Sequence, residues 1–161
     1  MGKQAPSQTQ RLSQSVKQRT WRSLAAILVG TADGSSVIRL VNSPLNRVVN
    51  VKESATIERV TITGGTNTNG AGGGINNDGS IEIENSTADN NTAGRKGSGL
   101  RDNGSDTVIL NSTFVGNKAS PGGAVSSTGT TDLTHVTIVR NQATSNSSAG
   151  LISKNDDTDT D

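Results

Sequence analysis

Few residues of this chain could perform acid–base or metal chemistry. There is one histidine, His135, and there is no cysteine, so the chain has no thiolate ligand and no second imidazole for a metal site. Nothing near His135 suggests a nucleophile elbow, and we interpret it as a turn or surface residue. The remaining candidates for catalysis are carboxylate and guanidinium groups, at Asp89, Asp102, Asp106, Arg101 and Arg140.

These candidates do not recur at matching places along the chain. A hydrolytic pair needs two carboxylates about 5 to 9 Å apart. Asp89 aligns with valines in the units that follow it, whereas Asp102 and Asp106 are expected in a turn. We therefore expect no catalytic residues, no cofactor and no metal site, and we predict that the protein is not an enzyme.

The elements that would position these side chains are defined by an internal repeat. The segments RVTITGG, NSTADNNTA, NSTFVGNKA and HVTIVRNQA recur every 24 to 26 residues, a period typical of a solenoid. Apolar residues fall into three columns that we predict to be the core: Ile57, Ile83, Ile109 and Leu133; Ile62, Ala88, Phe114 and Ile138; Ile75, Leu100, Val125 and Leu151. Equivalent residues of successive turns would therefore stack on one another.

Short β-branched runs joined by glycine and asparagine turns predict an all-β fold, a short right-handed parallel β-helix. Each unit has a Gly-rich corner, a short strand, a second turn with glycine and two more strands, which suits a coil with three faces. Asn91, Asn117 and Asn141 occupy one further column. We predict that they form a hydrogen-bonded ladder along the axis, the alternative being three ordinary turn asparagines.

Alternation along the strands predicts which side chains point outward. With Ile83 inward, Glu82 and Glu84 point out. The equivalent outward places of the later turns carry apolar residues, which we predict to be an oligomer interface, for a homotrimer or a docking face: Val108, Leu110, Val115 and Val139. Scattered surface valines or a locally shifted register remain the alternative.

Two further ligands fit the outer surface poorly. The segment GAGGGINNDG lacks the GGxGxD spacing of calcium-binding repeats, and Asp78 has no counterpart in the other turns. An outward column of threonines could order water as ice-binding surfaces do, but its neighbouring column is chemically mixed and β-propensity alone explains it. This column consists of Thr61, Thr87, Thr113 and Thr137.

Charge is placed unevenly along the 161 residues, although the net charge is only +1 and 29% of the residues are hydrophobic. The first acid is Asp33, so a basic arm precedes the repeats. We predict that the arm binds an acidic protein surface, and we expect no nucleic-acid partner because a single aromatic gives little for bases to stack on. The residues expected to bind the partner are Lys3, Arg11, Lys17, Arg19, Trp21 and Arg22.

We divide the chain into a basic arm or capping segment (1–30), a parallel β-helix (31–153) and an acidic tail (154–161). Residues 12–29 could form a short helix that caps the solenoid, because Leu12, Val16, Leu24 and Leu28 fall near one face. The apolar run 24–30 is at the short limit of a signal-peptide core, and we favour an uncleaved segment. Seven residues cannot span a bilayer, and we expect no membrane partner.

The repeats resemble those of polymorphic outer-membrane-protein and related adhesin-type parallel β-helices, which share the pectate-lyase-like fold. The resemblance rests on ATIERVTITGG and GAGGGINNDGSIEIENSTADNNTA, with the corner Gly72 to Ile75, the triplet Asn85 to Thr87 and the closing Asn91, and it covers roughly residues 48–143. It implies a fold that serves lyases, adhesins and phage components alike.

Three functions follow as hypotheses. The leading one is a virion decoration or cement protein on the capsid surface, whose arm docks on the major capsid protein. The alternative is an adhesin fragment that is secreted or displayed on the bacterial surface. The third is a polysaccharide-active enzyme, since such enzymes on this fold use acidic clusters with arginine or lysine.

Overall fold

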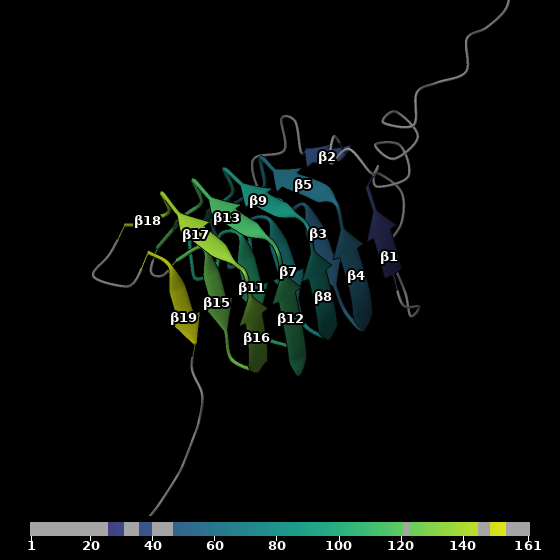
Figure 1. The fold of residues 1–161 in the computed structure, drawn as a ribbon. Helices are drawn as coiled ribbons and strands as arrows, with labels where there is room; N and C mark the ends of the chain where they lie inside the picture. The colour runs from purple at the N-terminus through teal and green to yellow at the C-terminus, as the bar shows by residue number, and fades with distance from the viewer. Residues whose placement is uncertain (1–25, 31–35, 40–46, 121–122, 145–148, 154–161) are drawn as a thin grey trace, which may run out of the picture.

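The structure, a computed structural model, describes residues 26–30, 36–39, 47–120, 123–144 and 149–153. Over these residues the chain forms nineteen strands and no helix, and it winds through about four turns in which neighbouring strands run parallel (Figure 1). The predicted all-β parallel solenoid is confirmed. None of the described stretches forms a helix with the length and apolarity that a bilayer crossing requires.

Four sheets make the wall. Each turn contributes one strand to each sheet, except that the first turn has no described strand in the fourth sheet. Sheet A contains β1 (Ala26–Val29), β4 (Ser54–Glu58), β8 (Ser80–Glu84), β12 (Asp106–Leu110) and β16 (Thr130–Thr134). Sheet B contains β2 (Ser36–Arg39), β5 (Val60–Thr63), β9 (Thr87–Asp89), β13 (Thr113–Val115) and β17 (Thr137–Val139).

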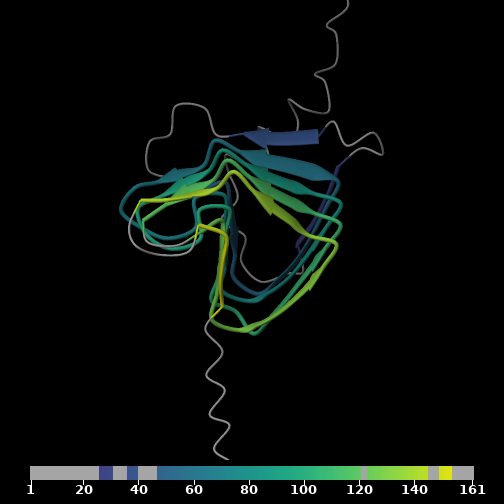
Figure 2. The same cartoon turned by 60° about the vertical axis from the view of Figure 1, so that its left-hand side comes forward.

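The other two sheets close the coil. Sheet C contains β3 (Val49–Val51), β7 (Ile75–Asn77), β11 (Leu100–Asp102), β15 (Val125–Ser127) and β19 (Leu151–Ser153). Sheet D is narrower, with β6 (Thr66–Asn67), β10 (Thr92–Ala93), β14 (Lys118–Ala119) and β18 (Gln142–Ala143). Seen close to the axis, the turns lie one behind another, with sheets A and D on opposite sides (Figure 2).

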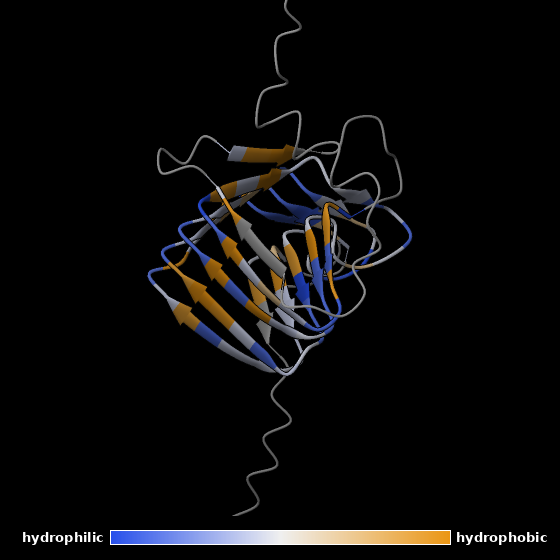
Figure 3. Cartoon of the chain, turned by 90° about the vertical axis from the view of Figure 1, so that its right-hand side faces the viewer, coloured by the Kyte–Doolittle hydropathy of each residue, from blue (hydrophilic) through white to orange (hydrophobic). Residues whose placement is uncertain are grey.

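The three apolar columns read from the repeat lie in register across neighbouring strands. Ile57 pairs with Ile83, Ile83 with Ile109 and Ile109 with Leu133 in sheet A. The second column follows sheet B and the third follows sheet C. Hydrophobic and hydrophilic residues alternate along the stacked strands (Figure 3). One narrow core therefore runs along the axis.

Burial of these columns falls off in the last turn. Ile109 is 0% exposed and Phe114 is 1% exposed, whereas Leu133 and Ile138 are only half-buried and Leu151 is 37% exposed. The cause is positional, because a residue of an inner turn is covered by a turn on each side. No strand among the described residues pairs with the far edges of β16, β17 and β19.

Two corners of each turn use the left-handed backbone region. At the corner between sheets A and B the residues have φ between 46° and 54°, and they are Arg59, Asn85, Asn111 and His135. At the corner between sheets B and D the equivalent residues are Gly64, Asn90, Gly116 and Arg140. Glycine and asparagine tolerate this region best. The single histidine is thus a corner residue.

The helix expected over residues 12–29 is wrong at its C-terminal end. Ala26–Val29 form the edge strand β1, in which the backbone of Leu28 is in register with that of Ile57 in β4. Pairing with β4 satisfies the backbone of this segment and outweighs the weak helical periodicity. The solenoid therefore includes residues assigned to the arm. Residues 1–25 and 154–161 lie outside the described residues.

Candidate functional site

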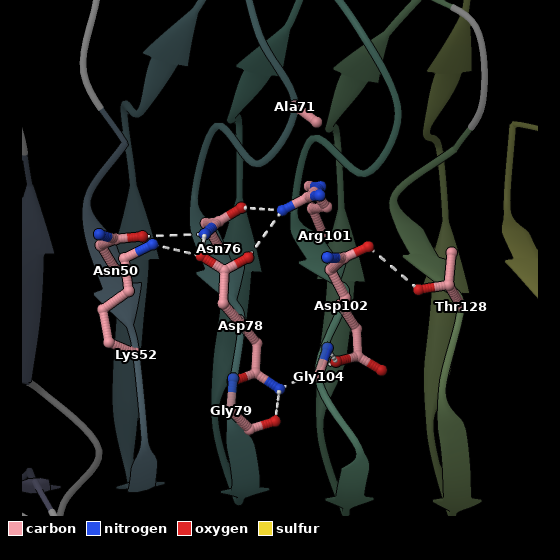
Figure 4. A network of polar contacts seen from close by, with 12 residues as sticks. Asn50, Lys52, Ala71, Asn76, Asp78, Gly79, Arg101, Asp102, Gly104 and Thr128 are labelled. Carbon is pink, nitrogen blue, oxygen red and sulfur yellow. Dashed lines mark hydrogen bonds and ion pairs between the residues drawn. The ribbon is translucent and has the colours of Figure 1, made fainter.

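The most connected charged cluster lies on the outer side of sheet C. Asp78 follows β7, and its carboxylate accepts hydrogen bonds from Lys52 Nζ (2.5 Å), Arg101 (2.9 Å) and Asn76 Nδ2 (3.1 Å). Arg101 also donates to Asn76 Oδ1 (2.8 Å), and Asn76 Nδ2 donates to Asn50 Oδ1 (2.9 Å). The network thus crosses three neighbouring strands, β3, β7 and β11 (Figure 4). We call these five residues the Asp78 cluster.

Glycines let the preceding loop fold back over this side of sheet C. Gly72 has φ +69°, and a Cβ there would lie 3.0 Å from Asn76 Cβ. Gly97 has φ +66°, and a Cβ there would lie 2.8 Å from Arg101 Cα. Only glycine allows both this conformation and this approach. The loop explains why Asn76, on the outer face of its strand, is 1% exposed.

The electrostatics of the cluster favour a permanently charged carboxylate. Partial burial raises the pKa of Asp78, but hydrogen bonds from Lys52, Asn76 and Arg101 and the charge of Lys52 outweigh it, and the pKa lies below its ordinary value of 3.8. A general acid at neutral pH needs the opposite shift. The cluster is therefore suited to cross-linking neighbouring turns or to presenting the half-exposed Lys52 and Arg101 to a ligand.

Asp102, one of the candidate catalytic residues, points into the wall. It is 1% exposed, and its carboxylate accepts hydrogen bonds from Asn77 Nδ2 (2.9 Å), Gly104 N (3.1 Å), Ser127 Oγ (2.6 Å) and Thr131 Oγ1 (3.4 Å). The expected turn position is wrong, because Asp102 ends β11 and Asp106 begins β12. The Asp102 carboxylate therefore links its own turn to the preceding turn through Asn77 and to the next turn through Ser127 and Thr131.

A buried polar column surrounds Asp102, and sequence reasoning missed it. Asn77, Asp102 and Ser127 are in register in sheet C, and each accepts a hydrogen bond from the glycine N–H two residues later. Such local bonds stabilise turns. The signal was present in NNDGS, DNGSD and STGTT, whose glycines recur at the same offset.

The remaining candidates are dispersed over the molecule. Asp89 faces outward on sheet B beside Thr63, Asp106 is exposed at the start of β12, and Arg140 lies at a left-handed corner. Of the five candidates, only Arg101 joins the Asp78 cluster. Over the described ranges no group of three or more histidine, cysteine, aspartate or glutamate side chains could hold a metal ion.

The asparagine column forms a continuous hydrogen-bonded ladder. Asn91 Nδ2 donates to Asn117 Oδ1 (3.1 Å), and Asn117 Nδ2 donates to Asn141 Oδ1 (3.1 Å). Each side-chain amide also donates to a backbone carbonyl of the preceding turn, that of Ile62, Ala88 or Phe114. Each Oδ1 in turn accepts a hydrogen bond from a backbone N–H of the preceding turn, that of Gly65, Asn91 or Asn117. Both functions of the amide are used in the interior, where Asn91 and Asn117 are 0% exposed.

A second ladder, of serines, was not predicted. Ser86 Oγ accepts from Val60 N (3.2 Å), and Ser112 Oγ accepts from Ser86 N (3.1 Å). Each hydroxyl donates to a carbonyl two residues earlier, that of Glu84 or Leu110. The Asn-Ser-Thr triplet thus combines a left-handed corner, a buried ladder serine and an outward threonine, and its recurrence was the available signal.

The residues predicted for oligomerisation lie on two adjacent faces. Val108 and Leu110 are half-buried on the outer side of sheet A, where their strand partners include Glu82 and Glu84. Val115 and Val139 pair on the outer side of sheet B, and Val139 is 39% exposed. The threonine column lies beside them in register. The six predicted arm residues lie outside the described part of the chain.

No protein-family model, curated protein or solved structure matches this chain significantly. The parallel solenoid agrees with the fold that the repeats resemble, and it supplies no identity beyond the fold. Because one fold serves many functions, function has to be argued from the arrangement of the described side chains.

Proposed function

We propose that this protein is a non-enzymatic structural protein: a virion decoration or cement protein that docks on the major capsid protein through its basic arm and assembles as a homotrimer on the capsid surface. One observation carries the non-enzymatic part. The carboxylates that could have formed a catalytic group on sheet C are engaged by their own chain, Asp102 by four donors and Asp78 by three.

The chemistry of the wall supports a mechanical role. The asparagine and serine ladders, the Asp102 column and the Asp78 cluster all link one turn to the next. Hydrogen bonds between turns therefore add to the stabilisation that the narrow apolar core provides. A buried carboxylate or amide used in this way cannot exchange its hydrogen-bond partners without loosening neighbouring turns. Such a wall is suited to a rigid platform that presents surfaces to a partner.

The charge pattern supports docking through the arm. The five cations of the first 25 residues have no acid among them, which favours an acidic partner surface and association that weakens with salt. Apolar residues on two adjacent faces support the homotrimer. The faces meet at the Asn111 corner, with Val108 and Leu110 on sheet A and Val115 and Val139 on sheet B, so together they form a bent surface. A bent surface can contact two neighbours around a threefold axis.

Binding to particles tests the proposal. Antibody against the chain should detect it in density-purified virions, and the full-length protein should co-sediment with particles stripped of it. Replacing the arm cations with glutamine (Lys3, Arg11, Lys17, Arg19 and Arg22) should abolish co-sedimentation. A control with Lys118→Gln and Arg140→Gln, both exposed on the solenoid, should bind normally. Absence from virions, or equal binding by both variants, would refute the docking role.

The trimer has a separate test. Sedimentation velocity of the full chain should give a trimer, and Val115→Lys should give a monomer, because a charge would be buried in the contact. Thr87→Lys, on the same sheet but outside the apolar pair, is the matched control and should remain trimeric. A wild-type protein that stays monomeric at high concentration would refute the trimer but would leave the proposed docking of the arm unaffected.

An adhesin identity is the second candidate, and the repeated Asn-Ser-Thr triplets within a parallel solenoid favour it. It predicts a cleaved N-terminus in the protein isolated from cells, which intact-mass measurement would detect. It also predicts binding to a host or glycan surface that does not depend on the arm. The polysaccharide-active alternative predicts turnover in lyase or hydrolase assays with acidic glycans, which we expect to be absent.

A further inference from the structure

The outer side of sheet A is an acidic face with an apolar centre. Val108 pairs with Glu82 on one side and with Asp132 on the other, and Leu110 pairs with Glu84. Neighbouring strands lie about 4.8 Å apart, so carboxylates flank Val108 on both sides and Leu110 on one side, with Thr134 on the other. Figure 1 shows the strands β8, β12 and β16 side by side. We call this surface, with Asp106, the acidic face.

No cation among the outward residues of β4, β8, β12 and β16 balances this charge. The carboxylate of Glu58 is paired with Arg59 at the corner, and Glu84 accepts only the neutral Asn85 amide. Glu82, Asp106 and Asp132 are exposed. Like charges on neighbouring strands repel one another, and a basic segment laid across them would relieve this repulsion while covering Val108 and Leu110.

The chain itself carries a segment with the complementary composition. Residues 1–25 contain five cations and no acid, together with the apolar Leu12, Val16 and Trp21. This segment leads directly into β1, the edge strand of the same sheet. The face begins two strands away, and β12 is three strand spacings from β1, or about 14 Å. An extended chain of 25 residues reaches about 80 Å.

We propose that residues 1–25 dock in cis on the acidic face of sheet A. Their cations pair with Glu82, Asp106 and Asp132, and their apolar side chains cover Val108 and Leu110. Tethering raises the effective concentration of the arm at this face to the millimolar range, so modest individual contacts suffice. This contact does not depend on the function proposed above.

One consequence does rest on the proposed function. A capsid surface that captures the arm would uncover Val108 and Leu110, so that docking and the trimer contact would be coupled. The free protein would then form its trimer through Val115 and Val139, and the contact through Val108 and Leu110 would be added at the particle.

The absence of native cysteine from the sequence makes a direct test clean. A paramagnetic label on Ser13→Cys of the full chain should weaken the amide NMR signals of Glu82, Val108 and Asp132. Signals of sheet D, on the opposite side of the coil, serve as the reference and should keep their intensity. Raising salt from 0.1 M to 1 M shortens the Debye length from about 10 Å to about 3 Å and should reduce the effect by about twofold or more.

Charge reversals separate specific docking from general attraction. Glu82→Lys or Asp132→Lys should restore most of the lost signal, whereas Asp89→Lys, an equal change on sheet B, should leave the effect intact. Unchanged shifts of core amides such as Ile109 would show that the variants are folded. Signal loss that is absent, uniform over the molecule, or equally reduced by all three reversals would overturn the proposal.

A mixture identifies the occupant. When spin-labelled chains at natural isotope abundance are mixed with unlabelled, ¹⁵N-enriched chains, docking in cis predicts no signal loss in the enriched chains at low concentration. Signal loss of the same size as within one chain would assign the face to the arm of a second copy and overturn docking in cis.

Discussion

Removing one amide from the asparagine ladder should destabilise the whole solenoid. In Asn117→Ala three buried groups each lose a hydrogen bond: the Ala88 carbonyl, the Asn91 N–H and one Asn91 Nδ2–H. Asn91 is 0% exposed and Ala88 is 4% exposed, so water replaces these bonds poorly. At about 1 kcal/mol or more for each abandoned buried group, the free energy of unfolding should fall by about 3 kcal/mol or more. That is a large part of the roughly 5 to 15 kcal/mol of a typical domain.

Urea unfolding followed by far-UV circular dichroism measures this loss. Asn69→Ala is the matched control, because Asn69 is exposed in a loop, and surface changes usually stay within about 0.5 kcal/mol. Asn141→Ala should fall between the two, since Asn141 is only half-buried and its abandoned partners are closer to water. Equal stability of Asn117→Ala and Asn69→Ala would refute the view that the ladder holds the turns together.

Three more predictions concern single positions. Gly97→Ala should lower the free energy of unfolding by about 2 kcal/mol or more, since φ is +66° and the new Cβ would overlap the Leu100 carbonyl. Gly150→Ala is the control in the same urea assay. It should lower the free energy of unfolding by under about 1 kcal/mol, because the atom nearest to the new Cβ is Ile138 Cγ2 at 3.8 Å. Lys52→Met should raise the pKa of Asp78, which NMR titration of the carboxyl carbon measures, and an unchanged pKa would contradict the proposed role of Lys52. Because the pKa of Asp78 is lower in the folded protein than in the unfolded chain, the stability that Asp78 contributes is present above the unfolded pKa. That stability is lost as the pH falls through the folded pKa. Arg140→Gly should raise the free energy of unfolding by up to about 1 kcal/mol and the melting temperature slightly, because φ is +54° at Arg140 and Gly116 occupies the equivalent corner one turn earlier. A lower melting temperature would contradict the strain argument.

The repeat predicted the core well because stacking imposes one environment on equivalent residues. Ile83 and Ile109 differ in sequence neighbours but share one column, and the period alone locates both. The asparagine ladder was predictable for the same reason, since Asn117 falls at the same offset from the apolar columns as Asn91. Ala88 and Phe114 share a column despite their difference in size, so the volumes of successive turns adjust to one another.

Features that depend on folding back of a loop were not predictable. The alternation rule places Asn76 on the outside of β7, and it does lie there, but the loop through Gly72 covers it. Asp102 was assigned to a turn because an acid at a strand end resembles a turn residue, and only the partners on neighbouring turns reveal its burial. Strand β1 was missed because its partner β4 lies about 30 residues away, beyond the reach of local periodicity.

Contacts between methyl groups of successive turns test the central claim, that equivalent residues stack in parallel and in register. In a methyl-labelled sample, nuclear Overhauser effects should link Ile57 with Ile83, Ile83 with Ile109 and Ile109 with Leu133. No direct effect should link Ile57 with Leu133, which lie three strand spacings apart, about 14 Å. Effects that connect Ile83 to outward residues such as Val108 in place of Ile109 would contradict the stacked solenoid and every site built on it.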